Sequence, residues 1–76
     1  MTTLKELRIG KRARILDVAG GDTLAARILE MGLTPGEVVV LRSIAPLGDP
    51  LEVEIRGYRL SLRRAEAARV TIQHLD

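Results

Sequence analysis

The chain has 76 residues, no Cys and a single His, and its formal net charge is only +2. A chain of this length buries about 60% of the surface that its unfolded form exposes, so we expect one small domain over residues 1–76 with little room for a catalytic cleft. Because Cys is missing and His occurs once, the sequence excludes both a disulfide framework and a Cys/His zinc site.

The predicted core is aliphatic. Hydrophobic residues make up 46% of the chain, Phe and Trp are absent, and Tyr58 is the only aromatic residue. The start has no apolar run of signal-peptide length, and no stretch of about 18 apolar residues occurs anywhere. We therefore expect a complete cytoplasmic protein.

Charge is unevenly distributed along the chain. Residues 1–16 carry five Lys or Arg against one Glu, residues 17–55 carry two Arg against seven acids, and residues 56–76 carry five Arg against two acids. If the two basic ends lie together in the fold, they form a positive patch. The competing interpretation is ordinary solvated charge.

The first elements are a threonine-capped turn near the start and a strand over residues 11–18. The alternation puts Ala13 and Ile15 on one face of this strand. Val18 joins that face only if a bulge near Leu16 shifts the register by one residue.

The next segment predicts a short amphipathic helix with defined ends. Asp22 follows two glycines and is a good N-cap. Gly32 supplies the left-handed backbone that ends the helix, Leu33 folds back in a Schellman-type cap, and residues 34–37 fit a type II turn. Apolar residues at i, i+4 and i+7 form one stripe on the helix: Leu24, Ile28 and Met31.

Residues 37–44 are rich in β-branched side chains and predict a strand, which the loop at residues 46–50 reverses. A two-residue turn at residues 56–57 then predicts a hairpin in which Glu54 lies opposite Arg59. Opposite charges at this place favour the register by at most about 1 kcal/mol. The hairpin pairs Ile55 with Tyr58, Val53 with Leu60 and Leu51 with Leu62.

A brief helical turn over residues 63–68 and a last strand ending near residue 74 complete the chain. Five short strands with one helix after the first predict a mainly β fold with a short inserted α-helix. The architecture that we expect is a small SH3-like, partly open β-barrel. An OB-like barrel is the competing topology.

Four motifs, taken with their spacing, carry a family resemblance. They are L-x-x-L-x-x-G at residues 4–10, R-I-L-E-M-G-L-T-P-G at residues 27–36, P-L-G-D-P at residues 46–50 and G-Y-R-L-S-L-R-R-x-E-A at residues 57–67. With these motifs the chain resembles the FeoA family of small cytoplasmic ferrous-iron transport proteins, over nearly its whole length.

This resemblance implies an SH3-like fold and a role beside FeoB, the membrane Fe(II) transporter with a cytoplasmic G-protein domain. The expected function is that of an accessory interaction module, which binds the G-protein domain or the membrane region of the transporter and is peripheral to the membrane through that partner. It implies no enzyme activity, catalytic set or cofactor. The same module occurs in some iron-dependent repressors, and the oligomeric state is open between a monomer and weak self-association.

Two surfaces are candidates for binding the transporter. The helix face comprises Leu24, Ile28, Met31 and Leu33, for which core packing is the competing role. The arginine face comprises Arg56, Arg59, Arg63 and Arg64, which could meet an acidic partner surface or anionic lipid headgroups.

Other ligand classes fit the residues less well. His74 stands alone and the acids show no ligand spacing, so the sequence predicts no metal site. A groove for Pro-rich peptides needs several aromatic side chains, whereas we expect Tyr58 to cap the core with its hydroxyl in water. Without further aromatic residues we expect no nucleic acid as partner, although a nucleic-acid-binding or repressor-type regulatory domain remains the alternative function.

Overall fold

The computed structural model describes all 76 residues, and they form five strands, two short α-helices and one 3₁₀ helix. In chain order the elements are η1 (Leu4–Glu6), β1 (Arg12–Val18), α1 (Thr23–Glu30), β2 (Val38–Ile44), β3 (Leu51–Ile55), β4 (Tyr58–Leu62), α2 (Arg64–Ala67) and β5 (Val70–His74). Neither α-helix has the length and the apolar run that a membrane-spanning helix needs.

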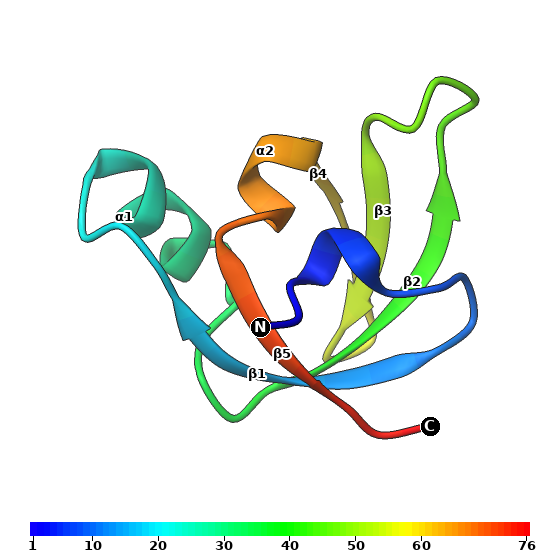
Figure 1. Ribbon diagram of the computed structural model, residues 1–76, viewed down its shortest axis with the longest axis horizontal. Helices are drawn as coiled ribbons and strands as arrows, with labels where there is room; N and C mark the ends of the chain where they lie inside the picture. Colours follow the sequence, from blue (N-terminus) through cyan, green and yellow to red (C-terminus); the bar gives the residue numbers. More distant parts are fainter.

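All five strands belong to one antiparallel sheet in the order β4-β3-β2-β1-β5. The sheet curves around its interior. Figure 1 shows η1 and α2 between β5 and the β3–β4 hairpin, with α1 beyond the end of β1. Because β4 and β5 each pair on one side only, the sheet is not closed into a barrel. The prediction of a mainly β, partly open architecture with an inserted helix is confirmed.

The bulge expected in the first strand is present in β1. Its register with β5 shifts between Ile15 and Asp17, so Leu16 is displaced outward and is 47% exposed. Beyond the bulge Val18 packs against the core, as the shifted alternation requires.

The β3–β4 hairpin has the predicted register at each of the five paired positions. Arg56 and Gly57 form its turn with φ of +53° and +84°. Positive φ at both central residues is the type I′ geometry, whose twist matches that of the strands it joins.

Both predicted helix caps of α1 are formed. The Asp22 carboxylate accepts a hydrogen bond from the Ala25 backbone N–H at 3.0 Å. At the other end Gly32 has φ +104°, and the Leu33 N–H donates to the Ile28 carbonyl at 3.4 Å. The second Schellman bond, from the Gly32 N–H to the Leu29 carbonyl, is 3.0 Å long. This cap turns the chain back onto the helix, so that Leu33 enters the core.

The core is a single cluster of 15 buried aliphatic residues inside the curved sheet. Leu4 from η1 and Ala67 from α2 cover it where the sheet is open. Glu66 is the one buried charged residue, and its Oε1 accepts the Arg63 N–H at 2.8 Å. This carboxylate caps α2 and thereby has a hydrogen-bond partner.

Candidate functional site

The side chains of the helix face pack mostly in or against the core. Ile28 and Leu33 are both 0% exposed, so neither side chain is free to meet a partner. Leu24 and Met31 are half-buried and pack against the same cluster. The core-packing role that the sequence left open therefore applies to Ile28 and Leu33, because the glycine cap folds Leu33 inward. Leu29, which lies outside the predicted stripe, is 38% exposed.

The arginine face is at the surface, and it spans β4 and the start of α2. Arg59 lies on the solvent side of β4. Arg63 follows β4 directly, and its position four residues after Arg59 places it on the same side. Arg56 lies in the turn before β4, and Arg64 begins α2. All four are exposed. The structure thus brings this predicted set to one edge of the sheet.

Most guanidinium groups of the arginine face already have partners. Arg56 forms an ion pair with Glu37, and Arg59 forms one with Glu52 at 2.8 Å. The Arg64 guanidinium donates to the Gly48 carbonyl at 3.5 Å. The guanidinium of Arg63 has no hydrogen-bond or ion-pair partner, so it is the free charge of this face.

The predicted position of Glu54 opposite Arg59 is confirmed by the register, but the two side chains form no ion pair with each other. Glu54 binds Arg42 of β2 at 2.8 Å, while Arg59 reaches diagonally to Glu52. The reason is that β3 is a central strand, so Glu54 has neighbours on both sides. Arg42 lies at the bulge between Leu41 and Ser43 and comes within reach from the other side.

These ion pairs hold the carboxylates in their charged form. A hydrogen bond from Arg56 lowers the pKa of Glu37, and one from Arg42 lowers the pKa of Glu54. Three acids of residues 17–55 pair with arginines of the second basic end: Glu37 with Arg56, Glu52 with Arg59 and Asp22 with Arg69. Counting charges along the sequence could not reveal this interleaving.

Tyr58 connects the two candidate surfaces. Its hydroxyl donates a hydrogen bond to the Met31 carbonyl at 3.0 Å, a protein partner that the sequence did not indicate, while the residue is 42% exposed. The acceptor is one of the carbonyls left free at the end of α1. A Cβ added to Gly32 would overlap this hydroxyl oxygen. Tyr58 thereby fixes the end of α1 against β4.

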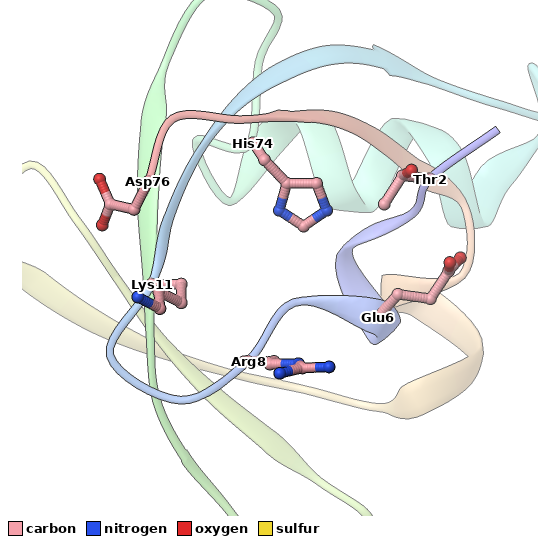
Figure 2. Close-up of a pocket in the computed structure, with 6 residues that line it drawn as sticks. All are labelled: Thr2, Glu6, Arg8, Lys11, His74 and Asp76. Carbon is pink, nitrogen blue, oxygen red and sulfur yellow. The ribbon is translucent and has the colours of Figure 1, made fainter.

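A pocket of about 410 Å³ lies at the other edge of the sheet. Figure 2 shows the His74 ring projecting from the end of β5 into this pocket, above Arg8, with Lys11 and Asp76 on one side and Glu6 on the other. No hydrophobic residue lines it. The lining residues are Thr2, Glu6, Arg8, Lys11, His74 and Asp76.

This pocket was not predicted from the sequence, although basic residues were evident at both ends of the chain. The basic ends were expected to form a patch if they met, and β5 indeed pairs with β1. Only Arg8 and Lys11 from the first end contribute here, because the arginine face lies on the opposite edge strand, β4. No group of three or more His, Cys, Asp and Glu side chains is placed to hold a metal ion.

Comparison with known proteins identifies the family. The FeoA domain model matches residues 2–74. A Porphyromonas gingivalis protein named Fe(2+) transport protein A/Fe(2+) transporter FeoB fusion protein is 40% identical over 70 residues. The match takes in 92% of this chain, which spans only 8% of the length of that relative.

Two solved structures of FeoA proteins superpose on nearly the whole chain. The solution structure of the protein from Chlorobium tepidum has a TM-score of 0.89 at 37% identity, covering 99% of this chain and 71% of that one. Stenotrophomonas maltophilia FeoA complexed with zinc, described as a prokaryotic SH3 domain protein, has a TM-score of 0.84 at 34% identity, covering 96% and 91%. The SH3-like prediction is confirmed over the OB-like alternative, and the chain belongs to the FeoA domain family.

Proposed function

We propose that this chain is a cytoplasmic accessory module of ferrous-iron uptake, which binds a FeoB-type transporter and alters its transport or GTPase cycle without catalysis of its own. The observation that carries this proposal is the relative in which the same domain is fused to FeoB. Fusion keeps two binding partners at a high effective concentration, which favours contact between them. We propose that this chain contacts a FeoB-type transporter in the same way without being fused to it.

The arginine face supports binding to an acidic surface of the transporter. The Arg63 guanidinium has no partner. Arg56 and Arg59 form ion pairs at the surface, and pairs of this kind contribute little to the stability of the fold. An acidic partner can therefore replace Glu37 and Glu52 at small cost. Charge complementarity of this kind raises the association rate and sets orientation more than it raises affinity.

The helix face supplies a smaller apolar component to this proposal. Leu24 and Met31 are partly accessible, and the Tyr58 bond keeps the end of α1 beside β4. An apolar contact flanked by arginines resembles the composition of protein interfaces, in which Arg and Met are enriched. The proposed interface is thus the arginine face together with the accessible part of the helix face.

Fe(II) uptake in a strain that lacks the chromosomal copy tests the function. Complementation with the wild type is expected to return uptake to its normal level, and the double variant Arg59→Glu/Arg63→Glu is expected to fail. The matched control is Lys5→Glu/Arg14→Glu, which makes the same change in charge at exposed positions outside both candidate surfaces. Recovery of the transporter from membranes by the tagged chain supplies the second measurement.

Two outcomes separate the parts of the proposal. Unchanged uptake in the deletion strain, together with no transporter retained by the tagged chain, contradicts the function. If the chain retains the transporter but both double variants behave like wild type, the function stands and the arginine face is the wrong surface.

A further inference from the structure

The pocket between η1 and the end of β5 has a charge arrangement that the proposed function does not use. Arg8, Lys11 and His74 project toward it from two segments far apart in the sequence (Figure 2). None of the three has an ion-pair or hydrogen-bond partner for its side chain. Three nitrogen donors thus line a concave site without a hydrogen-bond or ion-pair partner of their own.

The two acids of the pocket are engaged elsewhere. Oε1 of Glu6 accepts hydrogen bonds from the Thr3 backbone N–H at 3.1 Å and from its hydroxyl at 3.2 Å. Asp76 forms an ion pair with Arg12 at 3.0 Å and also accepts the Arg12 backbone N–H at 3.2 Å. These contacts lower the pKa of both carboxyl groups, chiefly through Thr3 and Arg12 respectively. Neither acid forms a hydrogen bond or ion pair with a cation of the pocket.

Backbone hydrogen bonds hold the cations in this arrangement. The Lys11 N–H donates to the Arg8 carbonyl at 3.0 Å, and Gly10 has φ +87° between them. Arg8 and Lys11 are therefore the first and last residues of a β-turn, whose Cα atoms lie within about 7 Å. Like charges at this separation repel each other. Asp76 attracts Lys11 through space, but no acid forms an ion pair with Arg8 or Lys11.

The pocket walls are also fixed with respect to each other. The Ile72 N–H donates to the Thr2 carbonyl and the Leu75 N–H donates to the Arg12 carbonyl, both at 3.0 Å. These bonds join the segment that carries Arg8 and Lys11 to the strand that carries His74. The backbone of the site is therefore formed in advance, and a ligand has to order only the side chains.

We propose that this pocket is an anion site that takes a phosphate group. Arg offers a planar set of N–H donors, Lys offers a point charge, and both are the usual protein ligands of phosphate oxygens. The His74 ring and the Thr2 hydroxyl supply further donors on the same cavity. An apolar small molecule finds no apolar wall here, and the acids needed for a metal ion are not grouped.

Titration of the full chain with inorganic phosphate at low ionic strength, followed by ¹⁵N–¹H NMR, tests the site. Saturable shifts are expected at the amides of residues 8–11 and 74. The double variant Arg8→Gln/Lys11→Gln is expected to weaken binding by tenfold or more, because it removes both charged donors of the site. Lys5→Gln is the matched control, an exposed lysine outside the pocket, and we expect it to change the affinity by less than about twofold.

A second arm distinguishes the source of the phosphate group. Sedimentation with phosphatidylserine vesicles, against phosphatidylcholine vesicles, is expected to depend on Arg8 and Lys11 if the ligand is a lipid headgroup. Binding of phosphate without vesicle binding assigns the site to a soluble phosphate compound instead. The proposal is overturned if neither probe binds, or if the Arg8→Gln/Lys11→Gln variant binds both as the wild type does. The outcome is independent of Fe(II) uptake, so this site and the transporter interface fail separately.

Discussion

The helix face and the arginine face carry equal numbers of predicted binding residues, but they differ in what keeps those residues in place. Ile28 and Leu33 are buried in the core and are held by packing. Arg56 and Arg59 remain at the surface and are held by exposed ion pairs. Burial of a Leu or Ile side chain stabilises a fold by about 1.5–3 kcal/mol, whereas an exposed ion pair contributes about 0–1 kcal/mol.

This difference indicates which surface can change without loss of the fold. A residue that stabilises the core cannot be moved toward a partner, while an exposed ion pair can exchange its partner at small cost. We therefore expect substitutions on the helix face to act on stability and substitutions on the arginine face to act on binding. The following predictions test that division, beginning with the largest effect.

Truncation of Leu33 gives the largest loss. Leu33→Ala is expected to lower the free energy of unfolding by about 2–5 kcal/mol, because it removes a fully buried side chain and leaves a cavity. Urea denaturation measures the effect. For a domain of this size the loss can approach the whole stability, so Ile28→Val, expected to cost about 0.5–1.5 kcal/mol, provides a folded companion.

Leu47→Ala is the control for this prediction, because Leu47 is 96% exposed in the β2–β3 loop. Its effect is expected to stay within about 0.5 kcal/mol. If Leu33→Ala and Leu47→Ala cost the same, the helix face is not held by the core and the comparison of the two faces fails.

A substitution at the helix cap gives the next largest effect. Gly32→Ala is expected to cost more than about 1 kcal/mol, since φ +104° is strained for any L side chain and the new Cβ meets the Tyr58 hydroxyl. In a Tyr58→Phe background the clash is removed and only the strain remains. Thermal or urea unfolding of the two single variants and the double variant measures this coupling.

Gly10→Ala serves as the reference for strain alone, because Gly10 has φ +87° and a Cβ there meets nothing within 4 Å. Gly32→Ala should cost more than Gly10→Ala in the wild-type background and about as much in the Tyr58→Phe background. Equal costs in the wild-type background would mean that Tyr58 does not press on the cap.

The elements of this fold could be predicted because they depend on local rules. Asp22, Gly32 and the Arg56-Gly57 turn each adopt the geometry that their position requires, and the hairpin register follows from them. Even the bulge near Leu16 could be inferred, because the apolar alternation is otherwise broken. These signals lie within a few residues of the features that they determine.

The contacts within the candidate sites could not be derived in the same way, because they join distant segments. Glu54 pairs with Arg42 rather than Arg59, since a central strand has two neighbours and the sequence shows only one of them. The Tyr58 hydroxyl finds the Met31 carbonyl, which is 27 positions away. The pocket joins residue 8 to residue 74, and only the return of β5 to β1 brings them together.

Acid is expected to weaken the attachment of α1 through Asp22. The hydrogen bond from Arg69, at 2.6 Å, and the one from the Ala25 N–H lower the pKa of Asp22 below its ordinary value of 3.8. A carboxyl with a depressed folded pKa stabilises the fold above its unfolded pKa, and this contribution is lost as the pH falls through the folded pKa. The free energy of unfolding should therefore fall as the pH decreases below about 4.

Asp22→Asn isolates this contribution, because Asn is as good an N-cap as Asp but carries no charge. The variant should lose stability near neutral pH and show a shallower decline in acid than the wild type. Denaturant unfolding at several pH values measures both slopes. Asp17→Asn is the matched control, since the Asp17 carboxylate has no ion-pair partner; an equal flattening in that variant would contradict the role of Asp22.

The smallest effect on stability is expected from Arg59→Gln. It removes an exposed pair with Glu52, so the free energy of unfolding should change by less than about 1 kcal/mol and by still less in about 1 M salt, where surface charges are screened. Arg63→Gln, which breaks no pair, should change stability even less. Urea denaturation at low and high salt measures both. A loss above about 2 kcal/mol for Arg59→Gln would show that this residue holds the fold together, and the arginine face would then be a structural element like the helix face rather than a surface free to bind a partner.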